Sequence, residues 1–150
     1  MKIIIINGPN LNLLSRRNPD IYGSKSLEEI NHELKKQAKE IGIEVEFFQS
    51  NHEGEIIDKL QNQAEFDGVI INPGALAHYS YSLRDALESL TRPAVEVHLS
   101  NIFAREDFRK QSVTAAVCSG FLAGFGWQVY VFALDIIVKL AAAKLKNSAS

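Results

Sequence analysis

A glutamate and a histidine lie two residues apart at the end of a short apolar run, in Glu96-Val97-His98. The run over residues 94–97 predicts a strand, and side chains two residues apart on a strand point to the same face. The carboxylate can therefore lie beside the imidazole, fix its tautomer and stabilise its protonated form. Glu-x-His is a weak signal by itself, but its place at the carboxyl end of a strand favours a general acid at His98. Leu99-Ser100-Asn101 follows and can offer backbone amides at a helix start, which suits a carboxylate.

Polar residues also follow the preceding predicted strand, over residues 68–71. Asn72-Pro73-Gly74 comes directly after it, with His78 a few residues beyond. Alone, this segment is typical of a turn into a helix, and a single histidine is more often structural than catalytic. Its position after a strand end keeps Asn72 and His78 as candidates for contact with a ligand.

Two arginines, Arg105 and Arg109, follow the Glu-x-His pair. A short helix predicted over residues 103–110 would place them on one face, because they are four residues apart. The alternative is a solvated helix in which they pair with Glu106 or Asp107. These acidic residues are expected on other faces, which weakens that alternative.

A long polar loop over residues 8–25 contains Asn10, Arg17 and Tyr22. Long loops without secondary structure are uncommon in small domains and are often functional. We therefore expect a lid over residues 15–25, with an ordinary solvated loop as the alternative.

The elements that must position these residues alternate along the chain. Strands are predicted by β-branched or apolar runs over residues 3–6, 43–48, 68–71, 94–97 and 113–118. Helices are predicted over residues 27–41, 53–65, 79–90, 103–110 and 127–145, the first opened by the capping box Ser26-Leu27-Glu28-Glu29. Such alternation implies right-handed crossovers and a parallel sheet covered on both faces. The predicted fold is α/β: a flavodoxin-like three-layer sandwich with a five-stranded parallel sheet in the order 2-1-3-4-5, which binds ligands beyond the carboxyl ends of its strands.

The composition fits a single catalytic domain over residues 1–150, since 46% of the residues are hydrophobic. The 16 basic and 18 acidic side chains give a net charge of −2, which argues against a nucleic-acid-binding surface based on bulk charge. Gly124 and Asp135 interrupt the apolar stretch at residues 121–138, so we expect no membrane span. The first apolar run is too short for a signal peptide, and the single cysteine, Cys118, allows no internal disulfide. We therefore expect a cytoplasmic protein, with Cys118 as a core residue.

The last predicted helix is apolar almost all round, which predicts that it is buried on most faces. The residues concerned are Val131, Phe132, Leu134, Ile136, Ile137 and Leu140. A chain of this length has limited core in which to bury such a helix, so we expect a large homo-oligomer.

Other chemistry finds little support. The chain has no P-loop and no Gly-x-Ser-x-Gly nucleophile elbow, and Gly124-Phe125-Gly126 matches only half of a dinucleotide fingerprint. The four histidines lie in unrelated elements without the spacing of metal ligands. We therefore expect neither a metal nor a cofactor.

Several segments together match one known pattern in order and in spacing. They are Asn7-Gly8-Pro9-Asn10-Leu11-Asn12-Leu13-Leu14, Arg17, Tyr22-Gly23, Asn72-Pro73-Gly74 with His78, Leu83-Arg84-Asp85-Ala86, and Glu96-Val97-His98-Leu99-Ser100-Asn101 with Ala104-Arg105-Glu106. The chain resembles the type II 3-dehydroquinate dehydratase family over essentially its whole length. The resemblance implies conversion of 3-dehydroquinate to 3-dehydroshikimate, by anti elimination of water through an enolate and without a cofactor, in the shikimate pathway or in quinate catabolism. It also implies flavodoxin-like subunits in a homododecamer of four trimers, with a small-molecule substrate and no nucleic-acid or membrane partner.

The resemblance further implies roles for individual residues. Tyr22 is implied as the base that removes a proton beside the ketone, and Arg17 as the cation that keeps it ionised. Asn10 helps to hold a water at the enolate oxygen. His98 protonates the departing hydroxyl and is oriented by Glu96. The remaining implied contacts, with the substrate or the lid, involve Asn72, His78, Asp85 from a neighbouring subunit, Leu99, Ser100, Arg105 and Arg109.

Two other functions fit parts of the sequence. A flavodoxin-like module that binds flavin or another phosphate ligand would explain the fold, but not Arg17, Tyr22 and His98 together. An inactive relative would keep the core and usually lose the site, whereas here every implied catalytic group is present.

The chain departs from the common family pattern at Ser15, Asn18, Leu76, Ala77, Gln111 and Val129. These departures concern the mobility of the lid and the affinity for the substrate, and none removes an implied catalytic group.

Overall fold

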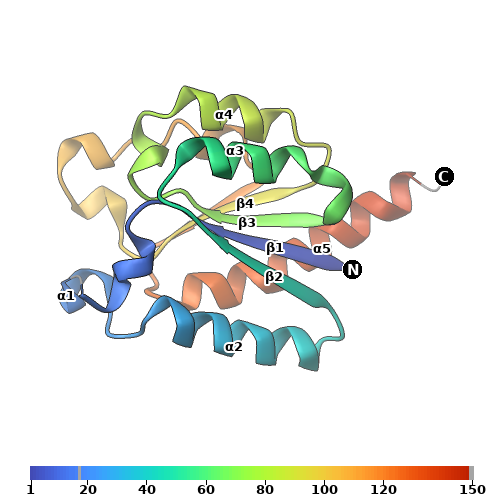
Figure 1. The fold of residues 1–150 in the computed structure, drawn as a ribbon, viewed down its shortest axis with the longest axis horizontal. Coiled ribbons are helices and arrows are strands. Elements are labelled where there is room, and N and C mark those ends of the chain that lie inside the picture. The colour runs from blue at the N-terminus through green and yellow to red at the C-terminus, as the bar shows by residue number, and fades with distance from the viewer. Residues whose placement is uncertain (17, 149–150) are drawn as a thin grey trace.

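The strands of the described chain all pair in parallel, in the order β2-β1-β3-β4-β5 (Figure 1). The computed structural model describes residues 1–16 and 18–148. The strand bounds are Lys2–Asn7 for β1, Glu44–Gln49 for β2, Gly68–Asn72 for β3, Ala94–His98 for β4 and Gly120–Ala123 for β5. One layer of helices contains α2 (Leu27–Glu40) and α5 (Gln128–Ser148), and the other contains α3 (Glu53–Gln61) and α4 (Tyr81–Glu88). This arrangement confirms the flavodoxin-like sandwich and the predicted strand order.

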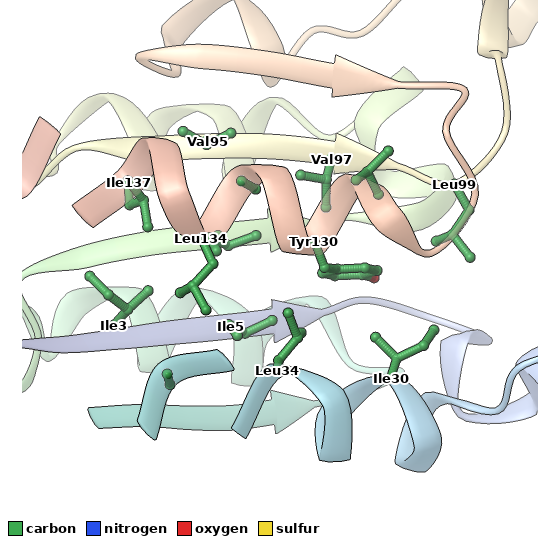
Figure 2. Packing of buried hydrophobic residues seen from close by; sticks show 14 of the residues in the cluster. Ile3, Ile5, Ile30, Leu34, Val95, Val97, Leu99, Tyr130, Leu134 and Ile137 are labelled. Atoms are coloured by element: carbon green, nitrogen blue, oxygen red, sulfur yellow. The ribbon is translucent and has the colours of Figure 1, made fainter. Parts of the chain in front are cut away.

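Strand β1 contacts both helical layers. Ile3 and Ile5 belong to the core cluster formed with α2 and α5 (Figure 2), whereas Ile4 and Ile6 belong to the cluster formed with α3 and α4. All four side chains are fully buried. Alternate side chains of a strand point to opposite faces, so a strand covered on both sides needs an unbroken apolar sequence.

Helix α2 begins at the predicted capping box. The Ser26 hydroxyl accepts the N–H of Glu29 at 3.2 Å, and Glu29 Oε2 accepts the N–H of Ser26 at 2.7 Å. These reciprocal bonds satisfy two backbone donors that the helix itself leaves unpaired. Gly42 then takes a left-handed conformation, with φ 74°, and turns the chain into β2.

The predicted fifth strand over residues 113–118 is wrong. The strand that pairs with β4 is Gly120–Ala123, and Ala115–Val117 forms a 3-10 turn. The N–H of Val113 donates to the Ala77 carbonyl at 2.8 Å, and the Thr114 hydroxyl donates to Glu96 Oε2 at 2.5 Å. The β-branched residues of this segment therefore hold a loop against the strand ends, and the next segment supplies the strand.

The predicted helix over residues 103–110 is also wrong. Two 3-10 turns, Ile102–Ala104 and Asp107–Arg109, replace it, and Arg105 between them is extended, with φ −110° and ψ −164°. Asn101 caps the first of these turns, since its side-chain oxygen accepts the N–H of Phe103 at 3.2 Å. Arg105 and Arg109 are consequently not related by one helical turn.

The segment between β1 and α2 is more structured than the predicted open loop. A 3-10 helix spans Leu11–Arg16, and the short helix α1 spans Pro19–Tyr22. Asn18 caps α1 by accepting the N–H of Asp20 at 3.0 Å, and Pro19 suits the first helical position because it has no N–H to satisfy. The lid assigned to residues 15–25 remains a prediction, and Arg17 lies outside the described residues.

Helix α5 is buried on one face in the single chain. The buried face contains Val129, Tyr130, Ala133, Leu134, Ile137 and Ala141. On the other face Phe132 remains 43% exposed and Ile136 39% exposed. The expected burial on most faces is therefore not reached within the single chain. No helix among the described residues is long and apolar enough to cross a membrane.

Gly8 brings the loops after β1 and β3 into close approach. Its N–H donates to the Asn72 carbonyl at 2.8 Å, and a Cβ at this position would lie 2.5 Å from the carbonyl oxygen of Pro73. Backbone atoms cannot yield as a flexible side chain can, so any larger residue would push the two loops apart.

We predict that Gly8→Ala lowers the free energy of unfolding by about 1–3 kcal/mol, because the added methyl overpacks this contact. The measurement is urea unfolding followed by circular dichroism. Gly54→Ala is the matched control, since Gly54 lies exposed in α3 with nothing within 4 Å of its added Cβ. The control should be neutral or gain roughly 0.5–1 kcal/mol from helix propensity. Equal unfolding midpoints for Gly8→Ala and the wild type would contradict this account of the contact.

Candidate active site

A cavity of about 140 Å³ opens at the carboxyl ends of β1, β3 and β4. Most of the residues predicted from the sequence line it, namely Asn10, Tyr22, Asn72, His78, His98, Leu99, Ser100, Arg105 and Arg109. Glu96 is fully buried behind His98, and Asp85 lies outside the cavity, exposed on α4. The parallel topology thus brings together side chains from segments far apart in the sequence, as expected for this fold.

The Glu96–His98 pair forms as predicted. His98 Nε2 lies 2.8 Å from Glu96 Oε1, and both side chains belong to β4. The hydroxyls of Ser112 and Thr114 also donate to this carboxylate, at 2.7 Å to Oε1 and 2.5 Å to Oε2. Three hydrogen-bond donors therefore compensate the desolvation cost of a carboxylate that has no exposed surface. With Nε2 donating to Glu96, a ligand meets the imidazole through Nδ1.

Ser112 and Thr114 were missed in the sequence. They follow Glu96 by 16 and 18 residues, and such a separation has no periodicity that points to a shared site. Their hydroxyls reach Glu96 only because the loop after the Asp107–Arg109 turn returns to the end of β4. Any polar residue in that loop could have been chosen equally well from the sequence.

Tyr22 and Arg105 form the second polar pair of the cavity. Arg105 Nη1 donates to the Tyr22 hydroxyl at 2.8 Å, and its guanidinium carbon lies 5.3 Å from the centroid of the tyrosine ring. Tyr22 is the last residue of α1, and Gly23 ends this helix in a left-handed conformation with φ 78°. The guanidinium charge of Arg105 therefore lies next to the phenol oxygen.

The expectation that Glu106 would lie away from the two arginines is wrong. Glu106 Oε2 lies 3.0 Å from Arg109 Nε and 3.6 Å from Arg105 Nε. The extended backbone at Arg105 breaks the predicted helix and lets both guanidinium groups reach the same carboxylate. Both arginines nevertheless line the cavity, so this pairing does not remove them from the site.

His78 lies beside His98, with stacked rings whose centroids are 6.4 Å apart. Its Nδ1–H donates to the backbone carbonyl of Gln111 at 2.8 Å. Burial lowers the pKa of His78 from its ordinary value, and this effect outweighs the bond to Gln111. The neutral ring then offers Nε2 as an acceptor for a hydroxyl group.

Asn10 is held in a left-handed conformation, with φ 69°. Its N–H donates to Asn51 Oδ1 at 2.9 Å, and Gln49 Nε2 donates to the same oxygen at 3.2 Å. Asparagine tolerates this conformation better than most residues. Asn51 and Gln49 therefore help to fix the turn that carries Asn10, and no pattern in the sequence points to either of them.

Within residues 1–16 and 18–148, no three His, Cys, Asp or Glu side chains are grouped so that they could hold a metal ion. Burial, with a smaller effect of the Glu96 charge, raises the pKa of the Cys118 thiol to about 12. A thiol with this pKa is inert as a nucleophile near neutral pH. Cys118 packs against the cluster between the sheet and α3 and α4, in agreement with its predicted place in the core.

We predict that His78 makes the fold less stable as the pH falls below 6.5, the ordinary histidine value. The unfolded chain takes up a proton there while the folded His78 stays neutral, so the unfolded state binds more protons and the free energy of unfolding falls with pH. His78→Gln should reduce this loss between pH 7 and pH 5, measured by urea unfolding at each pH. His32→Gln, at an exposed position on α2, should follow the wild type. Parallel curves for His78→Gln and the wild type would refute the neutral assignment.

Comparison with known proteins gives one consistent result. The family described as dehydroquinase class II matches residues 1–138. The chain is 55% identical over 140 residues to the 3-dehydroquinate dehydratase of Halothermothrix orenii, covering 93% of this chain and 95% of that protein. It is 50% identical over 146 residues to the 3-dehydroquinate dehydratase of Thermotoga neapolitana, covering 97% and 100%. The crystal structure of the type II dehydroquinase from Butyrivibrio crossotus matches with a TM-score of 0.89 at 48% identity, covering 91% of this chain and 97% of that one. The chain therefore belongs to the class II dehydroquinase family.

Proposed function

We propose that this chain catalyses the dehydration of 3-dehydroquinate to 3-dehydroshikimate. The observation that carries the proposal is the presence, in one cavity, of a tyrosine hydroxyl bound by Arg105 and an imidazole bound by Glu96. The first pair suits a base and the second an acid, and elimination of water needs both. Membership of the family supports the same reaction.

Tyr22 is the base in this proposal. Its ionised oxygen takes the proton from the carbon beside the ketone, and the electron pair left behind forms the enolate. The guanidinium of Arg105, 2.8 Å from that oxygen, stabilises its negative charge, and Arg17 keeps the same role implied by the resemblance. Asn10, held by Asn51, helps to place a water at the enolate oxygen.

His98 is the acid. It gives a proton to the departing hydroxyl, which leaves as water while the enolate collapses to the conjugated ketone. Glu96 stabilises the protonated imidazole before this transfer. Tyr22 stands at the end of α1 and His98 at the end of β4, so they reach the cavity from different elements. This suits removal of the proton and of the hydroxyl from opposite faces of the ring.

The other polar groups of the cavity bind the substrate. Asn72, His78 and Arg109 take its hydroxyls, and the backbone at Leu99 and Ser100 takes its carboxylate. Asp85 is exposed on α4 and is proposed to reach the cavity of a neighbouring subunit.

The direct test is to add 3-dehydroquinate to the purified protein and follow the ultraviolet absorbance of the conjugated product. Two further arms test the proposed chemistry: a chelator, and borohydride added together with substrate. We expect full activity in both, because the mechanism routes no step through a metal or an imine. Absence of product would overturn the function, and inactivation by either reagent would overturn the mechanism.

We predict that Tyr22→Phe lowers kcat by about 10²–10⁴, the usual share of a general base, or roughly 3–5 kcal/mol of barrier. Tyr79→Phe is the matched control, because Tyr79 is 63% exposed and should keep wild-type turnover. Arg17→Ala should slow turnover at neutral pH and recover some rate as the pH rises, because Arg105 is then the only one of the two proposed cations left beside Tyr22, and a higher pH favours the ionised phenol. If Tyr22→Phe keeps more than about a tenth of the wild-type rate, Tyr22 is not the base.

We also propose a homododecamer built as four trimers, located in the cytoplasm. Phe132 and Ile136 are exposed on α5, and the exposed ring of Phe125 lies 6.0 Å from that of Phe132. Phe103 is exposed as well, and these apolar side chains support burial against other copies. Light scattering should give a mass about twelve times that of the 16.7 kDa chain. A monomer at working concentration would refute the assembly and with it the role proposed for Asp85.

A further inference from the structure

The hydroxyl of Tyr130 lies between the ends of β1 and β3, next to the candidate active site. Tyr130 belongs to the first turn of α5, is fully buried, and directs its oxygen toward the carboxyl ends of the strands (Figure 2). Asn72 Nδ2 donates to this hydroxyl at 2.9 Å, and the hydroxyl donates to Asn7 Oδ1 at 2.5 Å. Asn7 and Asn72 are register partners at the ends of the two strands. One hydroxyl therefore connects the helix to both strands.

The direction of each bond follows from the donors present. The N–H of Gly74 donates to Asn72 Oδ1 at 3.2 Å, so the amide oxygen of Asn72 faces Gly74 and its nitrogen faces Tyr130. Burial raises the pKa of Tyr130 well above its ordinary value, so the hydroxyl keeps its single proton. This proton goes to Asn7, which leaves the hydroxyl oxygen to accept from Asn72. Together, Gly74 and Tyr130 select one of the two flip states of the Asn72 amide.

We propose that Tyr130 is a positioning residue for the dehydration, which orients the Asn72 amide toward the hydroxyl groups of the substrate. An amide carries two N–H groups and two lone pairs on its oxygen, and Tyr130 and Gly74 use one of each. The other N–H and the other lone pair can then donate to one substrate hydroxyl and accept from a second. This inference rests on the substrate contact proposed for Asn72, which lines the cavity.

The hydroxyl is not needed to fill the core. The ring of Tyr130 packs in the apolar cluster between the sheet, α2 and α5, where a phenylalanine would occupy almost the same volume. A hydroxyl in such surroundings is costly unless it is hydrogen-bonded. The residue type is explained by its two polar partners, Asn7 and Asn72, and one of them, Asn72, lines the cavity.

The test compares steady-state kinetics on 3-dehydroquinate for Tyr130→Phe, Asn72→Ala and the double variant. Ile137→Val is the matched control, because Ile137 is fully buried on the same helix, two turns beyond Tyr130, in the same core cluster. We expect Tyr130→Phe to raise KM about tenfold, roughly the share of one hydrogen bond. The pH dependence of kcat should stay unchanged, since neither Tyr22 nor His98 is altered. In the Asn72→Ala background, Tyr130→Phe should raise KM no further. Ile137→Val should keep the wild-type KM.

An unchanged KM in Tyr130→Phe would overturn the inference, as would an equal rise in KM with and without Asn72. If Asn72→Ala raises KM and Tyr130→Phe does not, the inference fails while the proposed site stands. If Asn72→Ala leaves KM unchanged, both the substrate contact of Asn72 and the inference fail. Should Tyr130→Phe not fold, Asn7→Ala removes the acceptor of the same proton and is expected to raise KM, and an unchanged KM in that variant would be equally decisive.

Discussion

Polar groups at the carboxyl edge of the sheet are buried, and each buried polar group needs a hydrogen-bond partner to avoid a large desolvation cost. The Glu96 carboxylate receives hydrogen bonds from His98, Ser112 and Thr114. Asn72, which is 2% exposed, is held between Gly74 and Tyr130. The partners come from distant segments of the chain, so satisfying these groups also fixes the loops that carry them. The same bonds therefore serve the stability of the fold and the shape of the cavity.

The cavity also places opposite charges beside the two groups proposed to transfer protons. Arg105 presents a positive charge to the Tyr22 hydroxyl, and the Glu96 carboxylate lies against the His98 ring. A cation next to a phenol favours its ionised form, and an anion next to an imidazole favours its protonated form. The proposed reaction requires these opposite states at one pH. Each pair has its own charged neighbour because Tyr22 stands at the end of α1 and His98 at the end of β4, two separate elements that meet at one cavity.

The sequence allowed prediction of the layers and of most cavity residues, because both depend on simple local rules. The unbroken apolar run of β1 indicates a strand covered on both faces, and the capping box of α2 indicates the start of a helix. Residues 113–118 gave the wrong strand because their β-branched side chains pack a loop against the sheet, and tertiary contacts override such a propensity. Ser112, Thr114, Asn51 and Tyr130 could not be chosen in advance. Each acts through hydrogen bonds that include at least one to a residue distant in the chain, and such a bond leaves no periodic pattern.

Helix α5 shows how one element can connect the site to the rest of the molecule. Its inner face packs on the sheet through Leu134 and Ile137 and also delivers the Tyr130 hydroxyl to the strand ends. Its outer face leaves Phe132 and Ile136 exposed. Tyr130 and Phe132 are two residues apart on a rigid helix, so a neighbour packed on the outer face would restrict the same turn that carries the hydroxyl. A single helical turn therefore carries both the hydroxyl that accepts from Asn72 and an apolar side chain that the single chain leaves exposed.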